Sequence, residues 1–421
     1  MAKVFQVQPK DSVLKLNAFD AINAIQNFNT DPAFNEEYYS ELGNPNFTTR
    51  SVQPEVTGSF ESTATGSMPA MLARMRYNYD TQTYSFNPAT KGNVFTFDET
   101  DFEFMVCDII NLKRPGATFS VATLLPHAQL TGMTLRMDST GTGGETYNFE
   151  GQLEEAFYKP YHDMVAVPLT TVNATTVQIP AAYSATINSG THAIMYVFQD
   201  NTKFDSSVCT YASNTNITVS GANFATSAPY DRISGVLYKR SPGSFPTIYY
   251  PTSARFVRGD RADIWLVWSG TTGLIDSNRL LRCQSIDITV DLPRERLTEI
   301  RRNNDKSTIY FRGLNYPLTI TGNLTILETT LETWATLQNK VLNESASVTP
   351  VDVNNVLNLA GFVPLTLVIK YYPQGSSTAL CTVTVDNCNV VGWSNRMAIG
   401  GRGEYTVNVT GSEISIVGAN G

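Results

Sequence analysis

Apolar and polar residues alternate strictly along two segments of the chain, residues 283–292 and 317–327. The apolar positions are Ile286, Ile288, Val290, Leu292, Leu318, Ile320, Leu324 and Ile326. Successive side chains of a strand point to opposite faces, so this pattern predicts two strands with one buried and one solvated face. A charged loop joins the segments, and we expect them to pair as a long hairpin.

The segment after the second strand has the period of an amphipathic helix instead. Its apolar stripe is formed by Leu327, Leu331, Trp334, Leu337 and Val341. Thr329 and Glu332 have the spacing of a capping box at the start of this helix.

Similar strand patterns occur earlier in the chain, in the same order, and they predict an internal duplication. Met133–Asp138 resembles Ile286–Asp291, and Phe149–Leu153 resembles Ile320–Leu324. The other matched pairs are Leu124–Gln129 with Leu280–Gln284, Phe104–Cys107 with Ile264–Val267, Ile194–Gln199 with Ile369–Gln374, and Val208–Thr210 with Leu380–Thr382. The alternative is two unrelated stretches of one large β fold, because alternating strands resemble one another by default.

The predicted fold class is therefore mainly β, with two barrel or sandwich lobes at residues 100–245 and 250–421. Each lobe is expected to carry a flanking helix or a short helical segment. Arg240–Pro246 is rich in turn formers, as a boundary between lobes should be. Residues 1–99 are the least regular, and 57–69 are small and polar, so we expect an extended N-terminal arm.

Composition narrows the classes of function. The 421 residues are 42% hydrophobic and 16% charged, with a net charge of −8, which argues against a dedicated nucleic-acid binder. Five cysteines without a CxxC pair are expected to be buried thiols rather than a disulfide framework. No secretory leader and no apolar run long enough to span a membrane is recognised, so we expect a soluble protein made inside a cell.

Catalytic patterns are lacking in the sequence. The three histidines, His127, His162 and His192, are scattered and have no metal-ligand spacing, and His127 is interpreted as a structural polar residue. There is no nucleophile elbow or phosphate-binding loop. A pair of carboxylates that faces a cleft, as in a glycosidase, remains open from sequence. We expect no enzyme activity, no cofactor and no metal site.

One charged cluster lies in the loop between the two alternating strands. Its members are Arg294, Glu295, Arg296, Glu299, Arg301, Arg302, Asp305 and Lys306. The cluster is compatible with three interpretations: a solvated hairpin tip, a nucleic-acid patch weakened by the interspersed acids, and a contact between copies of the protein. In such a contact mixed charges fix register, and arginine can hold a carboxylate bidentately.

Two runs of the second lobe resemble the major tail tube protein of tailed bacteriophages. The first run is Gln284–Ile300 followed by Pro317–Gly322, and the second is Trp393–Tyr405. The shared pattern is a strand, a Pro-Arg-Glu loop with a leucine, a returning strand and a Gly-rich closing hairpin. The resemblance covers about a third of the chain, and Arg301-Arg302 replaces a glycine that is common in the family.

The resemblance implies tail-tube-like β lobes that assemble in stacked rings around a channel for DNA. A one-lobe subunit would close a ring of six, so a duplicated subunit predicts a homotrimer with pseudo-sixfold symmetry, with a hexamer as the alternative. The implied partners are other tail proteins and viral DNA that passes without specific binding, and the implied location is the phage tail of the virion.

Two sets of residues are candidates for these roles. The ring-contact candidates are Arg294, Glu295, Arg296, Glu299, Arg301 and Arg302. The lumen candidates, on the polar strand face, are Asp287, Asp291, Thr319, Thr321 and Asn323. The competing functions are a tail-tip or baseplate ring protein of the same fold and a β-sandwich adhesin that binds carbohydrate.

Overall fold

The computed structural model confirms a mainly β chain. It describes residues 12–17, 25–33, 36–39, 48–51, 55–64, 66, 68–76, 94–116, 119–151, 155–159, 163–199, 202–224, 233–241, 258–268, 283–299, 308–327, 365–373, 376–396 and 403–419. The helix predicted from Leu327 to Val341 lies outside these residues, apart from its first position. Within them, no helix is long and apolar enough to cross a membrane.

The largest sheet contains 15 strands, all paired antiparallel. Its strands are β1 Ser12–Leu16, β2 Ile25–Ala33, β5 Glu55–Thr63, β6 Val94–Phe97, β7 Val106–Gly116, β8 Phe119–Asp138, β9 Gly144–Gly151, β10 Glu155–Lys159, β19 Ala262–Trp268, β20 Cys283–Asp291, β23 Thr319–Leu327, β24 Leu365–Tyr371, β25 Cys381–Arg396, β26 Glu404–Gly411 and β27 Glu413–Ala419.

The predicted hairpin is confirmed at the centre of this sheet. β20 pairs with β23, and Val290 lies opposite Ile320. Ile286, Ile288 and Val290 are buried, whereas the residues between them are partly exposed. The alternation therefore reflects burial on one face, as period-2 side-chain direction requires.

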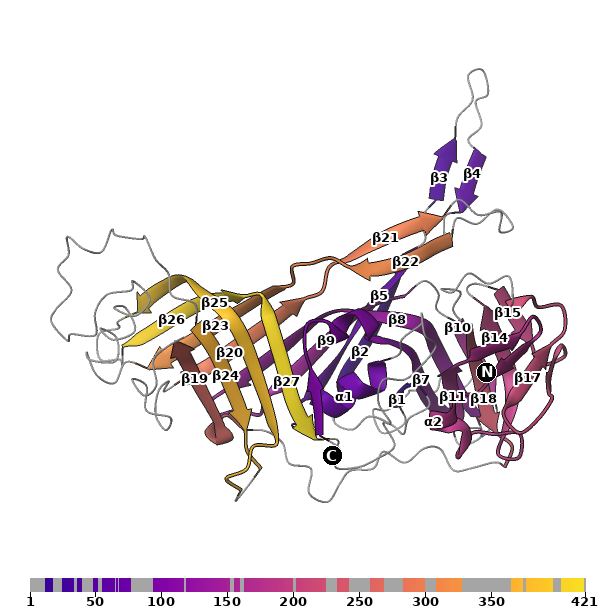
Figure 1. Ribbon diagram of the computed structural model, residues 1–421, viewed down its shortest axis with the longest axis horizontal. Coiled ribbons are helices and arrows are strands. Elements are labelled where there is room, and N and C mark those ends of the chain that lie inside the picture. Colours follow the sequence, from indigo (N-terminus) through magenta and orange to yellow (C-terminus); the bar gives the residue numbers. More distant parts are fainter. Residues whose placement is uncertain are drawn as a thin grey trace, which may run out of the picture.

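Eight strands form a central segment in the order β2-β5-β9-β8-β20-β23-β26-β25 (Figure 1). The first four precede residue 152 and the last four follow residue 282. Because every neighbouring pair is antiparallel, each strand of the first four runs in the same direction as the strand four places along. This direction is compatible with two four-stranded units related by a translation along the sheet, in which β2 corresponds to β20, β5 to β23, β9 to β26 and β8 to β25.

This arrangement corrects the alignment that the sequence suggested. The sequence matched Met133–Asp138 of β8 with Ile286–Asp291 of β20, but these strands are adjacent and antiparallel. Adjacent antiparallel strands are related by a local twofold axis, whereas the two four-stranded units are related by a translation along the sheet. The match of Phe149–Leu153 with Ile320–Leu324 fails in the same way, because β9 corresponds to β26. A repeat is present, but its units are different.

Irregularities at corresponding positions identify the true repeat. The pairing register shifts between Ile25 and Asn27 in β2–β5 and between Cys283 and Ser285 in β20–β23, and again between Leu130 and Gly132 in β8–β9 and between Val390 and Gly392 in β25–β26. His127 of β8 and Asn387 of β25 both have positive φ, 56° and 52°. Non-glycine residues rarely adopt this conformation, so its recurrence at corresponding positions supports a common origin of the two units.

One glycine in each repeat leaves room for a neighbouring side chain. A Cβ on Gly58 of β5 would lie 2.5 Å from the ring of Phe149, and one on Gly322 of β23 would lie 2.6 Å from Val409. Phe149 and Val409 occupy corresponding positions in β9 and β26. The sequence had matched Gly322 with Gly151 instead.

Each repeat folds the first half of its long strand into a second layer. β8 continues from the central segment to pair with β7 and β10, and β1 adds to β7. Correspondingly, β25 pairs with β24 and β27, and β19 adds to β24. These outer layers enclose the main core, together with α1 Met68–Met75 and the short helix η2 Asp101–Phe104. Residues 12–97 thus contribute four strands of the main sheet and α1 to the folded body, which corrects the predicted N-terminal arm.

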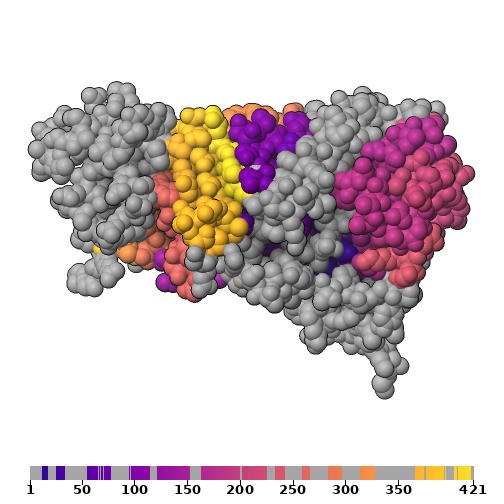
Figure 2. All heavy atoms as spheres, turned by 60° about the horizontal axis from the view of Figure 1, so that its bottom comes forward, coloured from indigo at the N-terminus to yellow at the C-terminus, as the bar shows by residue number. Residues whose placement is uncertain are grey.

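Residues 164–239 form a separate β-sandwich between the repeats, so the predicted lobe 100–245 is not one unit. The sheets have the orders β11-β18-β14-β15 and β12-β13-β17-β16. Their strands are β11 Met164–Pro168, β12 Thr170–Asn173, β13 Thr176–Gln178, β14 His192–Gln199, β15 Thr202–Asp205, β16 Cys209–Tyr211, β17 Asn216–Val219 and β18 Ile233–Lys239, with the helical turn α2 Ala181–Ser184. The sandwich has its own core. It lies at one end of the molecule in Figure 2.

The sandwich packs on the outer layer of the first repeat. Its side chains and those of β1, β7 and β8 form one cluster that consists of Val13, Ile110, Leu112, Ala122, Leu124, Met164, Ala166, Met195, Phe198 and Val236. The cross-strand pair Val13–Leu112 belongs to it, and the corresponding pair in the second repeat is Asp263–Lys370. A face that is apolar under the sandwich is therefore charged in the repeat that lacks one, as burial dictates.

Two further hairpins are inserted at corresponding places. β3 Glu36–Tyr39 and β4 Thr48–Ser51 lie between β2 and β5, and β21 Arg294–Glu299 and β22 Thr308–Leu314 lie between β20 and β23. Both hairpins extend beyond the sheet on the same side (Figure 1).

Candidate functional site

The polar face of the central segment is continuous across all eight strands. One row of cross-strand neighbours consists of Asn27, Glu61, Thr146, Thr134, Thr289, Thr321, Thr410 and Asn389. On the opposite face Phe60 stacks on Tyr147 with ring centroids 4.8 Å apart, inside the main core. The two faces thus have different tasks: one holds the fold together and the other is available to solvent.

The lumen candidates all lie on this polar face. Asp291, Thr319, Thr321 and Asn323 are exposed and Asp287 is half-buried. Their register is fixed, because Asp287 lies opposite Asn323 and Thr289 opposite Thr321. The sequence therefore grouped these residues correctly on one face, and their position relative to a channel stays a prediction.

Carboxylates predominate on this face. Its exposed or half-exposed acids are Asp31, Glu55, Glu61, Asp138, Asp287, Asp291 and Glu404. Among the side chains described here, Arg136 is the one cation that accompanies them. The described side chains of this face therefore carry a net negative charge, and such a charge repels phosphate groups.

The two repeats are joined by β8 and β20, and we call this pairing the internal junction. Arg136 donates from Nε and Nη2 to Oδ2 of Asp287, at 3.1 and 2.9 Å. The hydroxyl oxygens of Thr134 and Thr289 are 3.3 Å apart in the next cross-strand pair. The Arg136 side chain is 70% exposed, so its ion pair contributes little to stability.

The charged loop forms the hairpin β21–β22. Arg294 donates from Nε to the carbonyl of Leu130 and from Nη2 to that of Phe102, both at 2.8 Å. Its guanidinium therefore anchors the base of the hairpin within the chain. Glu295 is exposed, Arg296 and Glu299 lie further along β21, and Arg301 and Arg302 lie outside the described residues. Contact of this set with another copy remains a prediction.

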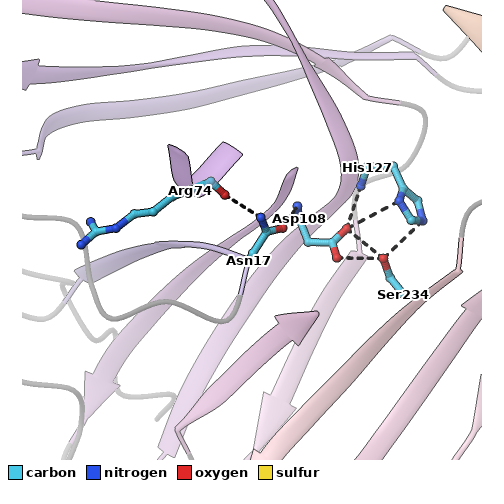
Figure 3. A network of polar contacts seen from close by, with 5 residues as sticks. All are labelled: Asn17, Arg74, Asp108, His127 and Ser234. Carbon is cyan, nitrogen blue, oxygen red and sulfur yellow. Dashed lines mark hydrogen bonds and ion pairs between the residues drawn. The ribbon is translucent and has the colours of Figure 1, made fainter. Parts of the chain in front are cut away.

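A buried polar network joins the sandwich to the first repeat (Figure 3). Ser234 Oγ lies 2.9 and 2.8 Å from the two carboxylate oxygens of Asp108 and 3.3 Å from His127 Nε2. Asp108 Oδ1 also accepts the backbone N–H of His127 at 2.9 Å. Asn17 accepts the backbone N–H of Asp108 and donates to the carbonyl of Arg74.

The network contains the residue types of a serine-hydrolase triad but not its geometry. A hydroxyl has one hydrogen, and Ser234 shares it with the carboxylate of Asp108 instead of giving it to His127. His127 Nδ1 is 3.8 Å from Asp108 Oδ1, and Asp108 and Ser234 are fully buried. We interpret the network as a structural joint that holds the positive-φ residues Asn17 and His127.

A second buried cluster crosses the same interface. Asp163, just before β11, forms ion pairs with Lys15 of β1 and Lys239 of β18. Burial alone would raise the pKa of Asp163, but the two ammonium groups lower it below its ordinary value. Nearby, burial and the charge of Lys239 lower the pKa of His192 from 6.5 to about 4, against the opposing effect of Asp163.

We expect His192 to destabilise the protein in acid. The unfolded chain binds a proton at His192 below pH 6.5 and the folded chain only near pH 4, so stability falls as the pH drops through this interval. His192→Gln should flatten that part of the profile, which urea unfolding at pH 7.5, 5.5 and 4.5 would measure. The same loss of stability in the variant and the parent protein would contradict the assignment.

The sequence predicts a structural role for one member of the joint, His127, whereas no motif marks Asp108, Ser234 or Asn17. Ser234 is 126 positions from Asp108, and both lie in strand segments that are buried on both faces, where alternation marks no residue. The polar residue Asp108 within the buried apolar run Val106–Ile110 was the available signal.

Comparisons with known proteins add no identity. No protein-family model matches the chain, and no curated protein sequence is significantly similar to it.

Proposed function

We propose that the protein is a major tail tube subunit of a tailed bacteriophage, a virion structural protein. Copies would assemble into stacked rings that enclose the channel through which viral DNA reaches the host. The observation that supports this most strongly is that the register shifts and a positive-φ residue of the first four strands recur four places along the sheet. Units related by such a translation correspond to successive positions of a ring with a single rotation axis.

The repeat also supports a trimer. If each four-stranded unit occupies one sixth of the ring, one chain supplies two neighbouring sixths and three chains complete the circle. Strand addition around a closed circle would leave no exposed sheet edge, which otherwise promotes aggregation. A hexamer of whole chains is the alternative, with a correspondingly wider channel.

The two faces of the central segment are suited to the lumen and the outer side of a tube. The polar face carries the carboxylates, and a lumen lined by them would repel the phosphates of passing DNA. The outer layers and the sandwich lie on the opposite side of the sheet. The outer layers pack on its apolar face, and the sandwich packs on the outer layer of the first repeat. The hairpins β3–β4 and β21–β22 extend from one side, where the next ring would lie.

Electron microscopy of the purified protein at rising concentration tests this function. Hollow tubes whose end views show six lobes, three of them enlarged by the sandwich, are the expected result. Closed rings that never stack would point to a tail-tip or baseplate protein. Monomers that bind a glycan array would point to an adhesin and would overturn the proposal.

We expect the lumen acids to be dispensable for assembly. Asp291→Asn removes an exposed charge that forms no ion pair with the side chains the structure describes, so tube yield and unfolding should be unchanged. Sedimentation of assembled tubes measures the yield, with Asp138→Asn as a matched control on the same face. Loss of tubes in Asp291→Asn alone would place this residue in a contact between copies instead.

A further inference from the structure

The two outer edges of the central segment are open within the described part of the chain. β2 pairs with β5 on one side, and no strand follows it in the sheet order. Residues 389–396 of β25 pair with β26 on one side, whereas β24 covers the other side of β25 only from Cys381 to Cys388. The internal junction shows how such edges can pair. In it β8 pairs with β20, and these strands correspond to β25 and β2.

We propose that β25 of one copy pairs antiparallel with β2 of the next copy, in the register of the internal junction. We call this pairing the seam. The inference rests on the proposed ring assembly and adds the identity of the contacting strands and their alignment. In the internal junction Thr289 lies opposite Thr134 and Asp291 opposite Gly132. The corresponding seam pairs are Asp31 with Ser394 and Ala33 with Gly392.

The hydrogen-bonding sides of both strands agree with this pairing. In the internal junction Leu292 donates to Thr131 and Ser139 to Gln284, so even-numbered residues of β20 face β8. The even-numbered residues of β2, such as Thr30 and Pro32, therefore face the open edge. Pro32 has no N–H, and a proline within a strand belongs on the side away from the existing ladder.

The seam is expected to be weaker than the internal junction. Pro32 replaces Val290 and removes one donor, and Asn29 replaces Asp287, the ion-pair partner of Arg136. Proline at a free edge also opposes unspecific strand pairing. A weaker seam lets free subunits persist before assembly, while the two halves of each chain stay joined.

Cysteine cross-linking tests the register. In the internal junction the backbones of Thr134 and Thr289 exchange no hydrogen bonds with each other, and cross-strand pairs of this kind have the short Cα separation that a disulfide needs. After oxidation, assembled Asp31→Cys/Ser394→Cys protein should give covalent trimers in denaturing gels, and reduction should return monomers. The native thiols should stay silent, because burial raises the pKa of Cys209 to about 11 and that of Cys283 to about 12.

Three controls separate the seam from accidental contact. Thr134→Cys/Thr289→Cys should form its disulfide within one chain, and neither Asp31→Cys nor Ser394→Cys alone should give trimers. Asp31→Cys/Asn389→Cys, which is out of register, should also fail. Equal cross-linking by the out-of-register pair, or tubes of normal appearance without cross-linking at Asp31 and Ser394, would refute the seam and leave the tube function standing. Covalent trimers that form no tubes would support the seam and refute the tube function.

Backbone variants test the seam without cysteines. Thr30→Pro removes an N–H that faces the open edge, so assembly should be lost at least tenfold in yield while unfolding of the free subunit is unchanged. Asp31→Ala, which leaves the ladder intact, is the matched control and should assemble normally. Pro32→Val supplies the missing donor and should lower the concentration needed for assembly. Normal assembly of Thr30→Pro would overturn the seam.

Discussion

Asp108→Ala is expected to lower the free energy of unfolding by about 4 kcal/mol, because two buried donors each lose a partner at about 2 kcal/mol. These donors are the Ser234 hydroxyl and the His127 backbone N–H, both bonded to a carboxylate that is fully buried. The change also leaves a cavity between the sandwich and the first repeat. Urea unfolding followed by tryptophan fluorescence measures the loss.

Two variants serve as controls for Asp108→Ala. Asp108→Asn keeps one acceptor oxygen for His127 and should cost less than half as much. Thr366 occupies the corresponding position in the second repeat, where its hydroxyl donates to Asp386 at 2.6 Å outside any sandwich contact. Thr366→Ala should therefore cost about 1 kcal/mol. Similar losses for Asp108→Ala and Thr366→Ala would show that the joint stabilises the fold no more than an ordinary side-chain hydrogen bond does.

Glu145→Gln is expected to stabilise the protein by about 3 kcal/mol above pH 8. Glu145 of β9 is 3% exposed and faces the main core, where it accepts a hydrogen bond from Tyr147 at 2.9 Å. Burial raises its pKa from 4.5 to about 7, and the bond from Tyr147 lowers it only in part. Above pH 7 the folded chain therefore carries a buried charge that glutamine removes.

The size of this stabilisation changes with pH in a defined interval. The folded chain binds a proton at Glu145 below pH 7 and the unfolded chain only below 4.5, so the parent protein gains stability from this group as the pH falls from 7 to 4.5. The advantage of the variant should thus vanish near pH 4.5. Glu61→Gln, on the exposed face of neighbouring β5, should change little at any pH. A destabilised Glu145→Gln at pH 8 would contradict the assignment.

The sequence predicted local structure better than it predicted which segments correspond. Ile286, Ile288 and Val290 identified a strand and its buried face, because alternation depends only on burial. The same alternation misled the repeat alignment, since β8 and β20 both alternate and both end in aspartate. Gly58 and Gly322 were the more specific signal, because close packing of one side chain against the backbone excludes other residues there.

The N-terminal strands and the sandwich were missed for different physical reasons. β2 is mostly polar and places only Ile25 and Phe28 against the main core, so its stability comes from pairing with β5. Pairing partners distant in sequence leave no local pattern. The turn formers Arg240–Pro246 follow the last strand of the sandwich directly, but nothing in the sequence marks where the sandwich begins, before β11.

The central claim is that one chain fills two successive positions of a ring. Native mass spectrometry of single rings, released from tubes by mild dissociation, tests it most directly. The expected particles contain three copies of the 46.3 kDa chain. Particles that contain six copies would contradict it, because each chain would then fill one position and the alignment of its two repeats would have no role in closing the ring.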